Sequence, residues 1–123
     1  MYYQMNSNND GISGIELEFW ENEVIFSIYD KYGYHRVTCG KGEWITTHAD
    51  IPGKELHHNR FFEAMDIGAI AAWTGENILE ISLAFLNLQS VDTIICELTE
   101  KKIIYKRSVQ FNADGLPVKK NGV

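Results

Sequence analysis

The stretch 77-NILEISLAFL-86 decides the fold class, because apolar and polar residues alternate along it. Successive side chains of an extended chain point to opposite sides, so one face carries Leu79, Ile81, Leu83 and Phe85. An amphipathic helix would instead repeat its apolar residues every three and four positions. The alternation therefore predicts a β-strand with one buried face.

The same period of two recurs in the first third of the chain. It is clear in 15-IELEF-19 and in 23-EVIFSIYD-30, and it continues in 34-YHRVTC-39. Between the last two lies 30-DKYG-33, where Gly33 can adopt the positive φ that tight turns need. These residues predict a β-hairpin preceded by another strand.

The second half adds three more strands after a less regular connection. We expect residues 40–65 to form that connection, in which 40-GKG-42 breaks the preceding strand and Trp44 opens another short one. A short helix at 60-RFFEAM-65 is the weaker alternative, and a further strand is expected near 66-DIGAIAAW-73. Two further strands follow at 91-VDTIICEL-98 and 101-KKIIYKRSVQF-111. Connections of a few residues favour antiparallel neighbours, because a parallel crossover needs about a dozen residues or more.

Seven or eight closely spaced strands with no strong helix signal predict an all-β fold. A sheet built from such strands must protect its edge strands, either by closing into a barrel or by stacking as two sheets. We predict a small antiparallel β-barrel or meander, lipocalin-like in outline, formed by residues 1–111 as a single domain. Residues 112–123 are rich in turn formers and are expected to be a C-terminal tail.

Composition narrows the range of partners. The 123 residues are 45% hydrophobic, enough for one packed core, and the net charge of −6 argues against a nucleic-acid partner. No run of 18 apolar residues is present, so we expect no membrane span. The opening 1-MYYQMNSNND-10 lacks the basic and apolar regions of a signal peptide, and cellular location stays open.

Charged residues within the strands are expected to face solvent. The basic cluster 101-KKIIYKR-107 alternates with apolar residues, as the wet side of a strand does. The acidic pairs Glu16 with Glu18 and Asp92 with Glu97 are interpreted in the same way. We therefore do not assign these carboxylates an acid–base role.

Motifs for covalent catalysis are missing from the sequence. No serine has a lysine three residues later, and no G-x-S-x-G elbow occurs. Cys39 and Cys96 have no CxxC partner and lie in apolar runs, which favours buried free thiols, although a disulfide between them stays open. We expect no catalytic residues, no cofactor and no enzymatic activity of the chain itself.

The histidines offer a competing hypothesis. His48, His57 and His58 lie close in sequence, but an adjacent pair on extended chain points to opposite faces, so only one of the two could join His48. Zinc needs three or four converging donors, and this spacing fits no familiar ligand motif. We interpret the region as a polar loop and predict no metal site; an enzyme built on this loop is the alternative.

The stretch 72-AWTGENILEISLAFLNLQSVDTIICELTEKKIIYKRSVQFN-112 resembles the C-terminal β-domain that follows the catalytic domain in bacterial serine hydrolases of the β-lactamase class C and penicillin-binding type. The resemblance rests on 73-WTGENILEI-81, 91-VDTIICEL-98 and 107-RSVQFN-112. The segment 87-NLQSV-91 departs from it, since the family usually has a proline there.

The first half is similar to the same family in 3-YQMNSNNDGISGIELEF-19, 35-HRVTCGKGEW-44 and 52-PGKELHH-58, so the resemblance covers nearly the whole chain. In that family the catalytic serine and lysine lie in the preceding domain, and none can be placed on this chain. The resemblance implies a non-catalytic accessory domain. Its partner would be a serine hydrolase catalytic domain in a longer parent chain.

These considerations lead to two functional hypotheses. The first is a structural or domain-docking module, with Trp20, Trp44, Phe61 and Phe62 as its docking surface. The alternative is a lipocalin-like barrel that binds a small hydrophobic ligand in an interior lined by aromatic residues. An exposed edge strand would also allow the domain to form a homodimer.

Overall fold

The computed structural model describes residues 1–5, 11–50, 65–85, 90–100 and 102–111, and these residues form an all-β fold, as predicted. No helix long and apolar enough to cross a membrane occurs among them. The strands are β1 (Tyr2–Gln4), β2 (Ile12–Phe19), β3 (Glu23–Asp30), β4 (Gly33–Lys41), β5 (Ile45–Ala49), β6 (Met65–Gly75), β7 (Ile78–Phe85), β8 (Ser90–Leu98) and β9 (Ile103–Phe111).

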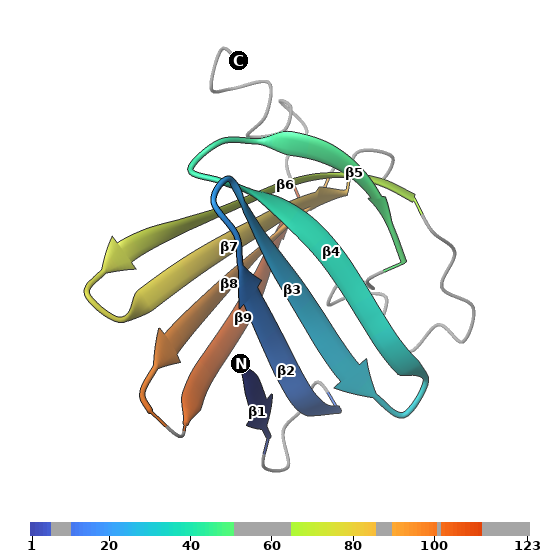
Figure 1. Ribbon diagram of the computed structural model, residues 1–123. Helices are drawn as coiled ribbons and strands as arrows, with labels where there is room; N and C mark the ends of the chain where they lie inside the picture. Colours follow the sequence, from blue (N-terminus) through green and yellow to red (C-terminus); the bar gives the residue numbers. More distant parts are fainter. Residues whose placement is uncertain (6–10, 51–64, 86–89, 101, 112–123) are drawn as a thin grey trace.

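The strands form one curled sheet that resembles half of a barrel (Figure 1). Strands β1 to β4 are antiparallel neighbours in chain order, and so are β6 to β9. Connections of a few residues produce both series, because only antiparallel strands can be joined by so short a turn. The barrel-like prediction is therefore confirmed, with nine strands among the described residues.

The two series meet in a short parallel pairing, which departs from a simple meander. β4 pairs with β6 only at Gly40 with Ile70 and at Lys41 with Ala71. The remaining part of that edge of β6, from Met65 to Ala69, pairs with β5 in the antiparallel sense. β5 therefore takes up most of the edge, and β4 reaches β6 only beyond the beginning of β5.

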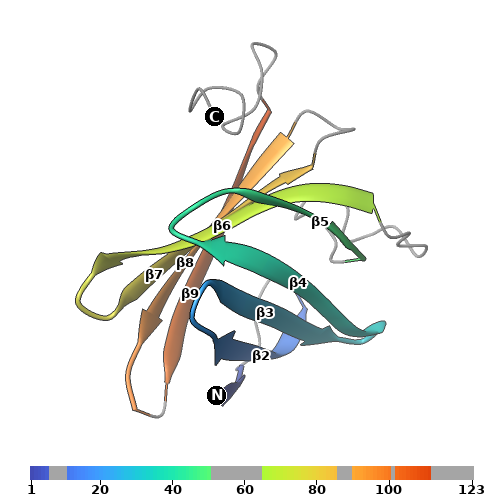
Figure 2. The same ribbon diagram turned by 45° about the horizontal axis from the view of Figure 1, so that its top comes forward.

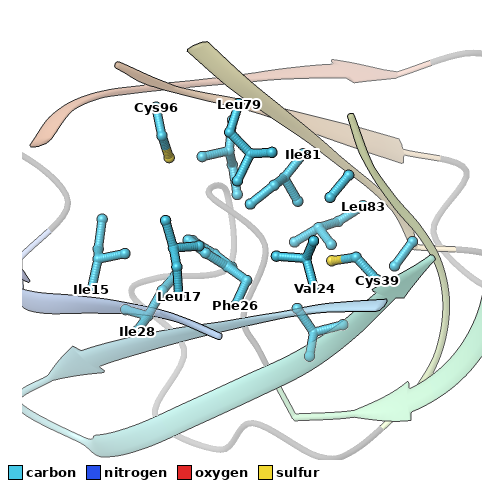
Figure 3. Close-up of a cluster of buried hydrophobic side chains, with 14 of the residues drawn as sticks. Ile15, Leu17, Val24, Phe26, Ile28, Cys39, Leu79, Ile81, Leu83 and Cys96 are labelled. Carbon is cyan, nitrogen blue, oxygen red and sulfur yellow. The ribbon is translucent and has the colours of Figure 1, made fainter. Parts of the chain in front are cut away.

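The hydrophobic core lies between the two series of strands (Figure 3). The predicted inward row of β7 is fully buried, and so is the row of β3 that faces it across the half-barrel. The members of these two rows are Val24, Phe26, Ile28, Leu79, Ile81, Leu83 and Phe85. Period-two patterning thus defines the core, because each strand contributes every second side chain to it.

One pair of charged residues lies inside this core, contrary to the sequence prediction. Asp92 and Arg107 were expected to face solvent, but their side chains are 1% and 0% exposed. Asp92 Oδ2 accepts hydrogen bonds from Arg107 Nη2 at 2.7 Å and from Arg107 Nε at 2.8 Å. Burial without such a partner would be very costly, so the two charges are kept inside by their pairing.

Both cysteines are free and buried in the same core. Burial raises the pKa of the Cys39 and Cys96 thiols to about 12, because the apolar surroundings disfavour the thiolate. The expectation of two buried free thiols is confirmed. A protonated, shielded thiol is a poor nucleophile, so neither residue is poised for catalysis.

Candidate docking surface

Four connections lie at one end of the half-barrel, and we call this the turn end (Figure 2). They join β2 to β3, β4 to β5, β6 to β7 and β8 to β9. Because β4 and β6 run parallel, the connections that follow them fall on the same side. The turn end is defined here as residues 19–23, 41–45, 73–78, 97–100 and 102–103.

All three tryptophans of the chain lie at the turn end. Trp20 directly follows β2, Trp44 directly precedes β5, and Trp73 lies near the end of β6. Trp20 is 58% exposed and Trp73 is 47% exposed, whereas Trp44 is half-buried. Large apolar side chains gathered on one exposed surface are typical of an interaction site.

One of these tryptophan rings, that of Trp73, forms an aromatic group with Phe19. The ring of Phe19 stacks on that of Trp73, with centroids 5.6 Å apart and planes 18° apart. The two residues come from β2 and β6, which are not neighbours in the sheet, so the stack joins the two series of strands. Phe19 is still 37% exposed, which leaves the stacked pair partly open to a partner.

A shallow depression adjoins this aromatic group. It has a volume of about 360 Å³ and is lined by Met1, Leu17, Glu18, Phe19 and Trp20. Its lining combines apolar side chains with one carboxylate. A depression of this size and openness suits a protruding side chain of a partner rather than an enclosed small molecule.

Two hydrogen bonds hold the backbone of the turn that carries Trp20. The Trp20 N–H donates to the Glu23 carbonyl at 2.8 Å, which closes the turn between β2 and β3. The Lys41 ammonium donates to the Trp20 carbonyl at 3.2 Å. The amide and the carbonyl of Trp20 are therefore both hydrogen-bonded, which restrains the backbone that carries this exposed ring.

The connection that carries Trp44 is tied to its neighbours in the same way. The Lys41 N–H donates to the Asn22 carbonyl at 3.0 Å, and the Gly42 N–H donates to the Ala71 carbonyl at 2.8 Å. One of these bonds reaches the Trp20 turn and the other reaches β6. These hydrogen bonds join the Trp20 turn, the connection that carries Trp44, and β6.

Glycine is required where this connection bends back. A Cβ on Gly40 would collide with the backbone carbonyl of Glu43 and touch the side chain of Ile45. Gly42 has a φ of 78°, in the left-handed region that side chains disfavour. The predicted break at 40-GKG-42 is therefore the tight turn that places Trp44.

The turn end is also acidic. Its exposed glutamates outnumber its exposed lysines by six to two among the described residues, and no arginine lies there. The exposed charged residues are Glu21, Glu23, Glu43, Glu76, Glu97, Glu100, Lys41 and Lys102. The connections that carry the exposed tryptophans therefore have an excess of negative charge.

No known family model, curated protein or solved structure matches this chain. The resemblance to the C-terminal β-domain of serine hydrolases consequently remains a prediction from the sequence. The geometry of the turn end has to be interpreted from its own residues.

The residues proposed from sequence as a docking surface are placed as follows. Trp20 is exposed and Trp44 is half-buried, and both belong to the turn end. Phe61 and Phe62 lie outside the described residues, as do residues 112–123 and the alternative helix at 60–65. Sequence reasoning did not include Trp73, although an aromatic residue next to a predicted turn is a signal that could have pointed to it.

The two described histidines, His35 and His48, each lie beside carboxylates. His48 Nδ1 lies 3.0 Å from Asp66 Oδ1, and both side chains are exposed. His57 and His58, the other candidates for that site, lie outside the described residues. Among the described residues, no three histidine, cysteine or acidic side chains are arranged to hold a metal ion.

His35 lies between two carboxylates and is buried. Its Nε2 is 3.1 Å from Asp30 Oδ1, and its Nδ1 is 3.7 Å from Asp50 Oδ2. Asp30 is buried as well, so the first contact is shielded from water. Because Asp30 is the last residue of β3 and His35 belongs to β4, the contact between them links the two strands near the turn of their hairpin.

A second aromatic group covers the outer face of β2 and β3, away from the core. The Tyr29 hydroxyl donates to Glu16 Oε1 at 3.0 Å, and the Tyr2 ring packs edge-on against Tyr29. Burial, and then the hydrogen bond to Glu16, raise the pKa of Tyr29. Glu16 thus lies on the outer face, as expected, and is half-buried and hydrogen-bonded there.

Proposed function

We propose that the chain is a non-catalytic accessory β-domain that docks on a partner domain through its turn end. The observation that carries this proposal is the gathering of Phe19, Trp20 and Trp73 as exposed rings on a hydrogen-bonded surface. Tryptophan is enriched in protein interfaces and dominates their binding energy. The resemblance to the C-terminal domain of β-lactamase-like serine hydrolases suggests a catalytic domain of that class as the partner.

The backbone bonding of the turn end favours a docking role. A surface already held in one conformation loses little conformational entropy when a partner binds. The aromatic side chains have only two rotatable bonds each, so they add large contact area at low entropic cost. These properties support recognition by a preformed surface.

The packed core supports the docking role over the lipocalin-like alternative. A ligand-binding barrel needs an open interior, whereas the inward side chains of β3 and β7 meet in one buried cluster (Figure 3). That alternative requires aromatic residues around an open interior, but Trp20 and Trp73 lie on the surface, and Phe26 and Phe85 belong to the packed cluster. No observation on the described residues favours a ligand within the half-barrel.

Binding to a serine hydrolase catalytic domain tests the proposal. The purified chain is titrated by calorimetry with a catalytic domain of the β-lactamase class C type from the same organism. We expect saturable binding that Trp20→Ala weakens at least tenfold, since truncating a central aromatic residue commonly costs about 1.4 kcal/mol or more.

Tyr32→Ala is the matched control, because Tyr32 is an exposed aromatic residue in the turn between β3 and β4, outside the turn end. We expect this variant to bind as the unchanged chain does. A lack of binding by the unchanged chain, or equal losses in the two variants, would contradict docking through the turn end.

A further inference from the structure

We infer that the surface recognised by the turn end is cationic, and that it presents arginine side chains to the exposed tryptophan rings. This inference rests on the proposed docking function and specifies the chemistry of its partner. The proposed partner is a protein surface rich in arginine, and lysine at the same positions should bind more weakly.

The charge of the turn end is the first reason. Six exposed glutamates lie in the connections of the turn end, against two exposed lysines among the described residues of that end. One of the two, Lys41, already donates to the Trp20 carbonyl. The field at this surface therefore attracts positive charge, and complementary charge raises association rates and sets specificity.

The exposed rings are the second reason. A cation over the face of an aromatic ring is attracted by the negative charge of the π-system, and tryptophan is the best such ring. Arginine suits this site better than lysine, because its planar guanidinium can stack on the ring while its N–H groups donate to nearby carboxylates. Glu21 directly follows Trp20 in the turn, so both kinds of contact are available close together.

The same charge disfavours a second copy of the chain at this surface. Two turn ends brought face to face would place their glutamates opposite each other, and like charges across an interface cost binding energy. The net charge of −6 adds to this repulsion at longer range. This repulsion does not apply to a homodimer formed through an edge strand of the sheet.

Charge-matched peptides test the inference directly. Three twelve-residue peptides, in which glycine alternates with arginine, lysine or glutamate, are titrated into the full chain and followed by tryptophan fluorescence and calorimetry. We expect the arginine peptide to bind at least threefold more tightly than the lysine peptide, and the glutamate peptide not to bind. Raising the salt from 20 to 200 mM should weaken arginine binding at least fivefold, because exposed charges are screened.

Paired variants separate a specific site from general attraction to an acidic protein. Trp20→Ala should weaken arginine-peptide binding at least fivefold, Trp20→Phe should recover part of it, and Tyr32→Ala should leave it unchanged. Glu21→Lys combined with Glu43→Lys should abolish binding. Asp66→Lys, which reverses an exposed carboxylate outside the turn end, should have less than a twofold effect.

Three results would overturn the inference. These are equal binding of all three peptides, arginine binding that Trp20→Ala does not change, and self-association of the chain through the turn end in sedimentation velocity. If the catalytic domain binds but is insensitive to salt and to the glutamate reversals, the cationic partner is wrong while docking stands. If the arginine peptide binds and the catalytic domain does not, the choice of partner in the proposed function is wrong.

Discussion

The interior of the half-barrel and the turn end use charged and apolar residues in opposite ways. Inside, the two charges of Asp92 and Arg107 are paired with each other at 2.7 Å among buried aliphatic side chains. At the turn end, six exposed glutamates lie in the same connections as aromatic rings that water reaches. The two interior charges contact each other, whereas the turn end leaves carboxylates and rings exposed.

This difference indicates which substitutions affect folding and which affect recognition. Changes in the interior remove contacts that the folded state needs, so their effects appear in the free energy of unfolding. Changes to the exposed Trp20 ring should appear mainly in binding, and loss of the Phe19–Trp73 stack should affect stability less than changes in the interior. Three measurements test this division, beginning with the largest expected effect.

Arg107→Met should be the most destabilising of these changes. It leaves the Asp92 carboxylate buried without the cation that holds it, and breaking a buried ion pair in this way typically costs about 3–5 kcal/mol. Urea unfolding followed by circular dichroism measures the loss.

The double variant Asp92→Leu with Arg107→Met is the control, because it replaces both charges by apolar side chains. Such replacements are commonly neutral or stabilising, so most of the lost free energy should return. A single variant as stable as the unchanged chain would show that the ion pair contributes little to the interior.

The two buried thiols should make stability fall at alkaline pH. Their pKa is raised to about 12 in the folded chain against 9.0 for an unperturbed thiol, so only the unfolded chain loses these protons just above pH 9. The stabilisation is fully present below about pH 9 and is lost as the pH rises towards 12. At pH 10 each thiol should lower the free energy of unfolding by about 1 kcal/mol.

Urea unfolding at pH 8 and pH 10 measures this dependence. The variant Cys39→Ala with Cys96→Ala should lose less free energy between the two pH values than the unchanged chain. An equal drop in both proteins would assign the effect to other groups, such as Tyr3, whose pKa burial also raises.

The Phe19–Trp73 stack should contribute the smallest effect. A double-mutant cycle with Phe19→Ala and Trp73→Ala should give a coupling free energy of about 0.5–1.5 kcal/mol, the usual range for an aromatic pair. Chemical unfolding of the four proteins supplies the cycle. A coupling near zero would mean that the stack does not link the two series of strands.

Alternation alone was enough to predict the interior rows. Val24, Phe26 and Ile28 fall on one face of any extended chain, and so do Leu79, Ile81 and Leu83. Short turns between the strands were equally informative, because they impose antiparallel pairing. Trp20 was named from the sequence as one of four aromatic residues of a docking surface, and it lies at the exposed end of the half-barrel.

The ion pair was missed because apolar residues occupy both faces of 91-VDTIICEL-98, so alternation did not identify the inward face. The inward face consists of Asp92, Ile94 and Cys96. An aspartate is normally solvent-facing, and only its pairing with Arg107 explains its burial. Trp73 was missed as part of the docking surface because its stack on Phe19 depends on the curl of the whole sheet. Contacts between strands that are not neighbours leave no periodic signal in the sequence.

The narrow parallel junction between β4 and β6 has a consequence for how the chain folds. Each antiparallel series contains mostly contacts between residues close in sequence, which form quickly, whereas only two residue pairs join β4 to β6. Each series can therefore assemble early as a meander, and we expect their closure over a shared core to limit the rate of folding.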